Sequence, residues 1–164
     1  MKPSMTKSDT VGSQKRGSGR QLKERNGRPN DYLFVYGTLR KDYDLKLKSK
    51  VSDDLHYVGQ GKVGASMYDI GRYPGAVRSS AGDEVIGDVF LITDVERVLK
   101  VLDKYEGINT DGRPSEFVRK RSRIRLRNGK EVMAWVYWYE FDLSKKVKIK
   151  QKNYLNYLKN KSSH

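Results

Sequence analysis

Short hydrophobic runs, most of them bounded or interrupted by glycine, dominate the middle of the chain. Residues 32–36 form an apolar and aromatic run that ends at Gly37, a pattern typical of a buried strand. Residues 55–70 and 85–92 also combine β-branched and aromatic residues, with glycines inside both runs. Glycine inside a strand indicates bulges and tight bends. The pattern therefore predicts a small curved sheet or barrel, with 85–92 as a central strand.

The pattern changes to helical spacing after residue 93. The sequence Thr93-Asp94-Val95-Glu96 matches a capping box, in which Thr93 caps the backbone N–H of Glu96 and Glu96 reaches back. The apolar positions that follow at helical spacing are Val95, Val98, Leu99 and Leu102. We expect one amphipathic helix over 94–105, ended by Gly107 as the C-cap residue.

A hairpin is predicted from 118–126 and 132–141, which are joined through Asn128-Gly129. The first arm carries arginine at every second position, from Arg119 to Arg127. A two-residue loop would set this arginine face beside Val132 and Ala134, a poor match, so a bulge or a longer loop is expected. The arginines could form an anion-binding surface or the solvated face of an edge strand. The second interpretation is favoured because charged side chains keep an exposed edge strand from aggregating.

Connecting segments are more polar. Residues 40–54 are charged and predict a loop or a short helix, and 71–77 predict a turn followed by a short strand. Residues 1–30 have too few aliphatic residues to bury a face, so a disordered basic tail is expected. Residues 31–143 form the predicted domain. The basic extension 144–164 carries apolar residues at helical spacing near its end, which favours a short helix.

Charge is concentrated at the two ends. Of the net charge of +14, residues 1–30 contribute +6 and residues 144–164 contribute +7, which leaves 31–143 at +1. Basic ends favour weak, nonspecific binding of anionic partners such as nucleic acid or an acidic membrane surface. The nearly neutral middle points instead to a small-molecule site.

Composition excludes several classes of chemistry. The chain has no cysteine, so disulfides and thiolate nucleophiles are impossible, and only His56 and His164 could serve as histidine ligands or bases. No phosphate loop, dinucleotide fingerprint or calcium loop occurs, so no cofactor or metal is expected. No run of residues is long and apolar enough to span a membrane, and a cytoplasmic location is expected.

Two stretches could carry chemistry. The strand over 32–36 ends at Gly37 and Thr38, where bare backbone N–H groups could hold a carboxylate or an oxyanion; a plain strand-to-turn junction is the alternative. Glu106 follows a buried helix face, where loss of water and the helix dipole would both raise its pKa. That pKa would suit a general acid and base, although a surface glutamate remains the alternative.

The motifs in order resemble the gamma-glutamylcyclotransferase-like family, most closely its branch of gamma-glutamylamine cyclotransferases and plant avirulence-induced proteins. The resemblance spans roughly 32–140 and rests on four stretches. These are Phe34-Val35-Tyr36-Gly37-Thr38-Leu39-Arg40, Arg72-Tyr73-Pro74-Gly75, Leu102-Asp103-Lys104-Tyr105-Glu106-Gly107, and an arginine-bearing strand followed by Ala134-Trp135-Val136-Tyr137.

The resemblance implies an α+β fold, a small mixed β-barrel with flanking helices and a cavity at one end. It implies that Glu106 is catalytic and that a substrate-holding loop is formed by Tyr36, Gly37, Thr38 and Leu39, with Tyr73 and Pro74 in a second loop. The implied enzyme is a lyase (or aminoacyl-transferring enzyme) that releases 5-oxoproline from a gamma-glutamyl amine or peptide, without metal or cofactor. The sequence departs from the family at Phe117, where a tyrosine is common.

A second function remains open from the sequence. The chain could be a non-catalytic family member that binds a small ligand or, through its basic tails, nucleic acid or an acidic partner. Activity lost in Glu106→Gln would favour the enzyme, whereas salt-sensitive binding lost on removal of the tails would favour the binding protein.

Overall fold

The structure is a computed structural model that describes residues 31–37 and 45–163. Residues 1–30, for which disorder was expected, lie outside the described part of the chain. Thr38 and Leu39 lie outside it as well. The strands are β1 (Asp31–Val35), β2 (Leu55–Asp69), β3 (Pro74–Arg78), β4 (Glu84–Ile92), β5 (Phe117–Leu126), β6 (Glu131–Tyr139) and β7 (Val147–Ile149). The α-helices are α2 (Leu45–Val51), α3 (Val95–Tyr105) and α4 (Tyr154–Ser162), and a 3-10 turn covers Ser52–Asp54.

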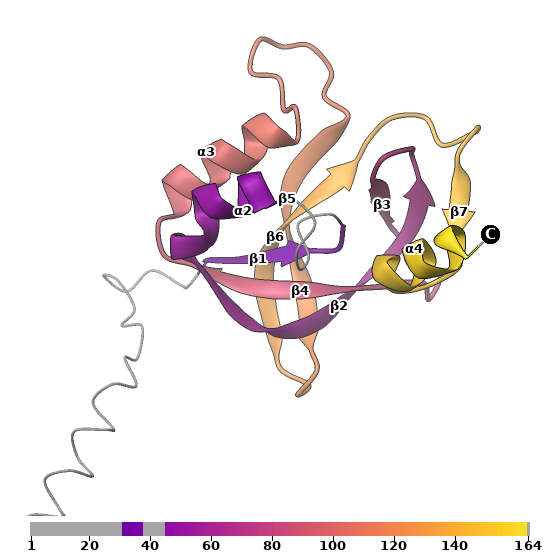
Figure 1. Ribbon diagram of the computed structural model, residues 1–164, viewed down its shortest axis with the longest axis horizontal. Coiled ribbons are helices and arrows are strands. Elements are labelled where there is room, and N and C mark those ends of the chain that lie inside the picture. Colours follow the sequence, from indigo (N-terminus) through magenta and orange to yellow (C-terminus); the bar gives the residue numbers. More distant parts are fainter. Residues whose placement is uncertain (1–30, 38–44, 164) are drawn as a thin grey trace, which may run out of the picture. The chain divides into compact units, whose positions relative to one another are not determined.

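Five strands close into a mixed barrel, in the order β2-β4-β1-β6-β5 and back to β2 (Figure 1). The β1–β6 pair is parallel, and the other four pairs are antiparallel. Strands β3 and β7 extend β2 beyond the barrel. In Figure 1, α2 and α3 lie together on one side of the barrel, and α4 lies on the other. The predicted α+β barrel with flanking helices is therefore confirmed.

Glycine makes the closure of the barrel possible. The long strand β2 carries a bulge between Tyr57 and Gly59, as its glycines predicted. Farther along the same strand, Gly61 pairs with Leu126 of β5, where the two ends of the sheet meet. A Cβ at position 61 would lie 2.6 Å from the Ile124 side chain, so a larger residue would separate the strands at the seam.

The β5–β6 hairpin has a longer loop than Asn-Gly alone would give. Arg125 pairs with Glu131, and the Leu126 N–H donates to the Lys130 carbonyl at 2.7 Å. Gly129 has a φ of +88°, so a three-residue loop with a left-handed glycine joins the strands. The expectation of a bulge or a longer loop is confirmed.

The arginine face of β5 is more structured than a solvated edge. The guanidinium groups of Arg119 and Arg121 lie 4.5 and 4.7 Å from the centre of the Trp135 ring. Arg121 also pairs with Asp31, and Arg123 lies 3.5 Å from Glu131. At its end β5 pairs with β2 as well as β6, so the interpretation of β5 as a free edge is wrong at that point.

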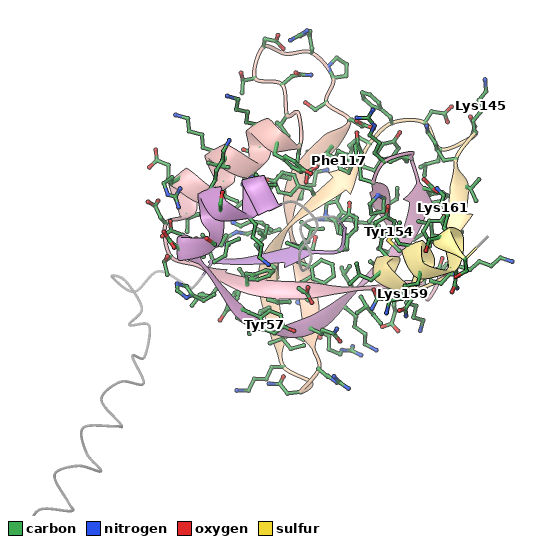
Figure 2. All side chains as sticks on the ribbon, viewed as in Figure 1. Tyr57, Phe117, Lys145, Tyr154, Lys159 and Lys161 are labelled. Carbon is green, nitrogen blue, oxygen red and sulfur yellow. The ribbon has the colours of Figure 1, made fainter. Side chains whose placement is uncertain are left out.

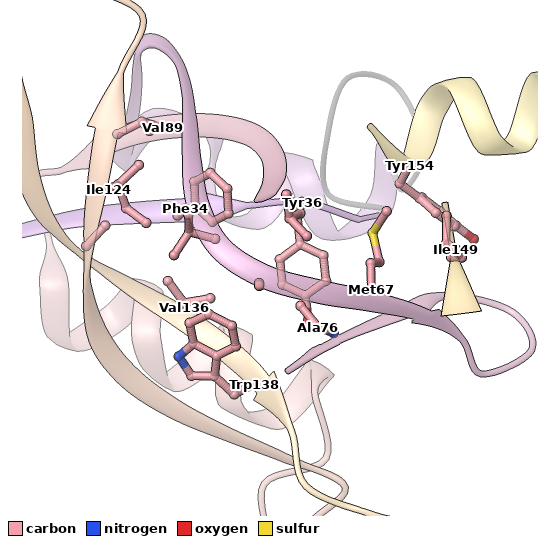
Figure 3. Close-up of a cluster of buried hydrophobic side chains, with 14 of the residues drawn as sticks. Phe34, Tyr36, Met67, Ala76, Val89, Ile124, Val136, Trp138, Ile149 and Tyr154 are labelled. Atoms are coloured by element: carbon pink, nitrogen blue, oxygen red, sulfur yellow. The ribbon is translucent and has the colours of Figure 1, made fainter. Parts of the chain in front are cut away.

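Strand β1 divides the hydrophobic core in two. Phe34 and Tyr36 face the barrel interior, where they join Met67, Val136 and Trp138 (Figure 3). Leu33 and Val35 face outward, toward the apolar sides of α2 and α3. This division follows from the two-residue period of a strand. It makes β1 the element that connects the barrel interior to the helical layer.

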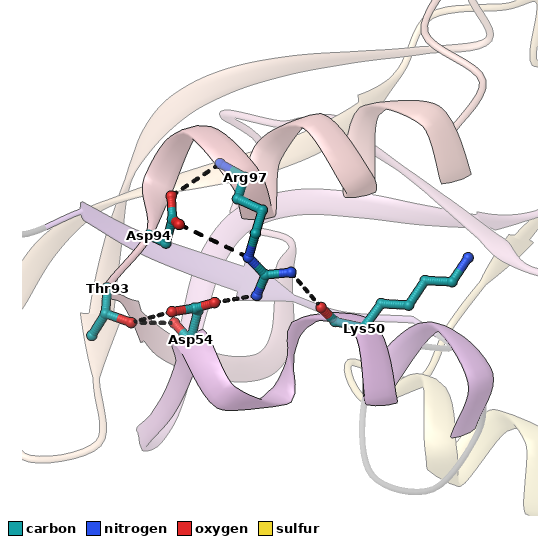
Figure 4. A network of polar contacts seen from close by, with 5 residues as sticks. All are labelled: Lys50, Asp54, Thr93, Asp94 and Arg97. Atoms are coloured by element: carbon teal, nitrogen blue, oxygen red, sulfur yellow. Dashed lines mark hydrogen bonds and ion pairs between the residues drawn. The ribbon is translucent and has the colours of Figure 1, made fainter.

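Helix α3 begins differently from the capping-box prediction. Its N-cap residue is Asp94, whose carboxylate accepts from the Arg97 N–H at 3.2 Å. The Thr93 hydroxyl instead donates to the carboxylate of Asp54 at 2.8 Å, and Arg97 pairs with Asp54 and donates to the Lys50 carbonyl (Figure 4). The capping role of Thr93 was wrong because Asp54, remote in sequence, competes for its hydroxyl.

The C-terminal segment packs on the barrel. Strand β7 pairs with β2, and the first residue of α4, Tyr154, is buried in the barrel core. The Tyr157 hydroxyl donates to the carboxylate of Asp69 at 2.5 Å. Lys145, Lys159 and Lys161, labelled in Figure 2, are exposed. No helix in the described part of the chain is long and apolar enough to cross a membrane.

Candidate active site

A cavity of about 330 Å³ opens where the end of β1 meets the end of α3. Its lining is mostly apolar and aromatic. The lining residues are Leu33, Phe34, Val35, Tyr36, Gly37, Arg72, Tyr73, Pro74, Leu102, Tyr105, Glu106, Phe117 and Tyr137. Its volume lies in the range of small-molecule sites. Glu106 is the only acidic residue and Arg72 the only basic residue among them.

The end of helix α3 fixes the position of Glu106. Gly107 has a φ of +69°, as expected for the residue after a helix C-cap. The Gly107 N–H donates to the Lys104 carbonyl at 3.2 Å, and the Ile108 N–H donates to the Asp103 carbonyl at 2.9 Å. These two bonds form a Schellman motif, which ends the helix sharply at Glu106. The carboxylate is thereby held at the C-terminal end of the helix and beside the cavity.

Gly37 allows the two loops of the site to approach each other. It is not one of the glycines with a positive φ, so the tight approach, rather than backbone freedom, explains its presence. A Cβ at position 37 would lie 3.0 Å from Cγ of Pro74 and 3.1 Å from Cδ. A side chain here would push the Pro74 loop away from the end of β1 and widen the cavity.

Tyr36 stabilises the site through hydrogen bonds to two other strands. Its hydroxyl donates to the Tyr137 carbonyl at 2.7 Å and accepts from the Ala76 N–H at 3.2 Å. Burial raises the pKa of Tyr36 far above its ordinary value, so the hydroxyl stays neutral. The side chain therefore joins β1, β3 and β6, while the backbone that follows it faces the cavity.

The environment of Glu106 favours the protonated carboxyl. Burial against the apolar lining, followed by the negative charges of Glu116 and Asp103, raises its pKa to about 7. At neutral pH the protonated and ionised forms are then similarly populated. A carboxyl group with this pKa can both accept and return a proton, which is the requirement for a general acid and base.

The two neighbouring acids are held in place. Asp103 accepts from Arg119 at 2.8 and 3.0 Å through its two oxygens, and from the Tyr137 hydroxyl at 2.6 Å. Glu116 accepts from the Tyr73 hydroxyl at 2.9 Å. The acid that faces the cavity is thus surrounded by a fixed set of charges.

The structure brings together five of the seven site residues predicted from the sequence. Tyr36, Gly37, Tyr73, Pro74 and Glu106 all line the cavity, whereas Thr38 and Leu39 lie outside the described residues. His56 is exposed on β2 and does not line the cavity. Within the described ranges, no group of three or more histidine, aspartate or glutamate side chains could hold a metal ion.

The sequence reasoning assigned no role to three other lining residues. Arg72 stands directly before the Tyr73-Pro74 motif, and that position could have marked it as a candidate. Tyr137 belongs to the Ala-Trp-Val-Tyr stretch used for the resemblance, but nothing in its spacing predicts a place beside Asp103. Phe117, noted as a departure, packs its ring 5.8 Å from that of Tyr73 and 5.6 Å from that of Tyr139, without a hydroxyl in the cavity.

Comparisons with known proteins identify the family of the chain. The sequence pattern of the family described as "Gamma-glutamyl cyclotransferase, AIG2-like" matches residues 33–156. A candidate gamma-glutamylcyclotransferase of Methanocaldococcus jannaschii is 32% identical over 114 residues, which cover 66% of this chain and 84% of that protein.

Solved structures show the same fold at lower identity. An AIG2-like mouse protein superposes with a TM-score of 0.55 at 21% identity, over 68% of this chain and 78% of that one. YkqA of Bacillus subtilis superposes with a TM-score of 0.62 at 19% identity, over 83% of this chain but 44% of that one, so this chain spans less than half of YkqA. Because the family pattern covers most of the chain and a relative aligns along most of its own length, the chain belongs to the AIG2-like gamma-glutamyl cyclotransferase family.

Proposed function

We propose that the protein cyclises a gamma-glutamyl amine or peptide, releasing 5-oxoproline and a free amine, with Glu106 as general acid and base. The observation that carries the proposal is the half-buried Glu106 carboxyl, with a pKa of about 7, in the lining of a cavity of about 330 Å³. A cavity of this size and apolar character suits the aliphatic gamma-glutamyl chain.

The first step is removal of a proton from the substrate's α-ammonium group by Glu106. The α-nitrogen then attacks the γ-carbonyl carbon of the same chain and closes a five-membered ring. Because the attack is intramolecular, holding the chain in a folded conformation supplies much of the rate acceleration. The aromatic side chains of Tyr73 and Phe117 would restrict the substrate to such a conformation.

Collapse of the tetrahedral intermediate breaks the bond between the γ-carbon and the leaving nitrogen. Two protons leave the α-nitrogen between the ammonium and the lactam, and the departing amine gains two, so the reaction needs no water. Glu106 would carry these protons across the site. A carboxyl group with an ordinary pKa would be almost fully ionised at neutral pH and would rarely hold a proton to donate. One with a pKa near 7 can both accept and donate the proton.

Backbone N–H groups at the end of β1 would hold the negative oxygen that develops on the γ-carbon, or the substrate's α-carboxylate. Gly37, which has no side chain, lines the cavity at this point. Thr38 and Leu39 are carried into this role from the family pattern alone. Tyr73 and Pro74 would form the opposite wall.

The decisive experiment measures 5-oxoproline release from gamma-glutamyl amines, gamma-glutamyl amino acids and glutathione by the full chain and by Glu106→Gln. We expect turnover of at least one of these compounds and a decrease in kcat/KM of roughly 10²–10⁴-fold in the variant, the usual contribution of a general base. A circular dichroism spectrum must show that the variant is folded. If no compound is turned over, or if folded Glu106→Gln keeps full activity, the proposal is wrong.

A further inference from the structure

A second, open groove of about 620 Å³ is lined by residues of β2, β3, β5 and β6 and of the loop after β3, and it shares no lining residue with the candidate active site. Every charged residue that lines it is an arginine: Arg78 from β3, and Arg121 and Arg123 from β5. Ser79 and Ser80 contribute hydroxyl groups. We refer to this surface as the arginine groove.

Arg78 is fixed in the groove without an acidic partner. One of its terminal nitrogens donates to the Ser122 hydroxyl at 3.1 Å and to the Arg121 carbonyl at 3.2 Å. Its guanidinium carbon lies 5.3 Å from the centre of the Trp138 ring. Among the described residues, Arg78 forms no ion pair with a carboxylate. Its position is thus set by an aromatic face and neutral acceptors, and no carboxylate in the described part of the chain compensates its charge.

The other two arginines add to this charge to different degrees. Arg121 is engaged by Asp31 and by the Trp135 ring. Arg123 is 73% exposed at its side chain, and its Nε lies 3.5 Å from Glu131, beyond a good hydrogen bond. Its guanidinium can therefore turn toward a ligand. With no acid in the lining and one arginine that no described carboxylate pairs with, the groove attracts anions.

We propose that the arginine groove binds a phosphate-bearing ligand. A guanidinium presents several N–H donors in a planar fork that matches phosphate oxygens, and it remains charged at every physiological pH. The nearby serine hydroxyls can donate to the remaining oxygens of a tetrahedral group. Ser79 Oγ accepts from the Ala81 N–H at 3.2 Å, which leaves its own hydrogen available to donate. The half-exposed Met133 offers an apolar wall beside this polar floor.

The test compares two sources of phosphate on the full chain at physiological salt. Tripolyphosphate binding is measured by calorimetry, and binding of a short fluorescein-labelled oligothymidylate by fluorescence anisotropy. The variant is Arg78→Gln, and the matched control is Arg127→Gln, which removes the same charge from the exposed hairpin loop outside the groove. We expect Arg78→Gln to weaken binding about tenfold, and Arg127→Gln to weaken it less than about twofold.

The pattern of losses identifies the source. If Arg78→Gln weakens tripolyphosphate binding alone, the ligand is a small phosphorylated molecule; if it also weakens oligothymidylate binding, the groove accepts a nucleic-acid backbone. Equal effects of the two substitutions would assign binding to overall charge and overturn the proposal, as would a wild-type chain that binds neither probe. If Arg78→Gln does not fold, the same binding measurements are made on Met133→Glu. An added negative charge at this exposed position must weaken binding if the groove is the site, and unchanged binding would overturn the proposal.

Discussion

The Tyr73 hydroxyl donates a hydrogen bond to the Glu116 carboxylate at 2.9 Å, and this bond links the cavity wall to the charge that acts on Glu106. Glu116 raises the pKa of Glu106 through like-charge repulsion. The hydrogen bond and the same negative charge help to raise the pKa of Tyr73 to about 12, after the larger effect of burial, so Tyr73 remains a neutral donor at neutral pH. Tyr73 therefore contributes to the site both through its ring and through the acid that it orients.

This arrangement predicts the effect of Glu116→Gln on the pH profile. In the wild-type protein, kcat/KM should rise with pH through about 7, because the ionised form of Glu106 accepts the proton. Removing the repulsive charge should move the acidic limb of the profile to lower pH. Glu140→Gln, which removes an exposed charge near Lys120, is the matched control and should leave the limb in place. An unchanged limb in Glu116→Gln would exclude the proposed electrostatic role.

Glu106 should also make folding stability depend on pH. Its pKa is about 7 in the folded protein and near the ordinary 4.5 in the unfolded chain, so the folded state binds more protons between these values. Stability should therefore decrease as pH rises from about 4.5 to about 7 and change little above that.

Glu106→Gln removes the carboxyl group whose ionisation destabilises the folded protein. We expect the variant to exceed the wild type in free energy of unfolding by roughly 1–3 kcal/mol above pH 7, with the difference shrinking toward acidic pH. Urea denaturation over a series of pH values measures it. A difference between the two proteins that stays constant with pH would show that Glu106 titrates normally.

Arg72 is predicted to bind a carboxylate of the substrate. It is the cation in the lining of the cavity, and a gamma-glutamyl compound carries at least one carboxylate. Arg72→Gln should raise KM about tenfold with a smaller effect on kcat, because charge-assisted hydrogen bonds contribute about 1.5–3 kcal/mol. Arg113→Gln, in the loop after α3 and outside the lining, is the charge-matched control. Steady-state kinetics in which both variants behave alike would exclude direct binding.

Gly87 is predicted to be essential for the barrel. A Cβ at this position of β4 would lie 2.4 Å from the Val35 carbonyl oxygen and 2.7 Å from the Phe34 ring. Gly87→Ala should therefore lower the free energy of unfolding by about 1–3 kcal/mol or more, as overpacking of a rigid core does. Gly64→Ala is the milder comparison, since its nearest contact would be the Ser79 carbonyl oxygen at 3.1 Å. Thermal denaturation should rank the two in this order.

The local pattern of the sequence determined most elements of the fold. Apolar runs bounded or interrupted by glycine predicted β1, β2 and β4, and the spacing of Val98, Leu99 and Leu102 predicted α3, because these signals arise from neighbours along the chain. The end of α3 at Gly107 was predictable for the same reason. The residue that caps its start was not, because the Thr93 hydroxyl bonds to Asp54, a residue 39 positions away.

The candidate site depends on the tertiary structure to a greater degree. Sequence motifs singled out Glu106 and the Tyr36–Gly37 stretch, but only the closed barrel places them beside one cavity. The sequence predicted a raised pKa for Glu106 from loss of water and the helix dipole, but the contribution of the Glu116 charge depends on the tertiary structure. The arginines of β5 gave a periodic pattern with two open interpretations. Only the tertiary structure brings Arg78 of β3 near Ser122 and Trp138, and so into one groove with two of these arginines. Such contacts join residues far apart in the chain, so the sequence could not predict them.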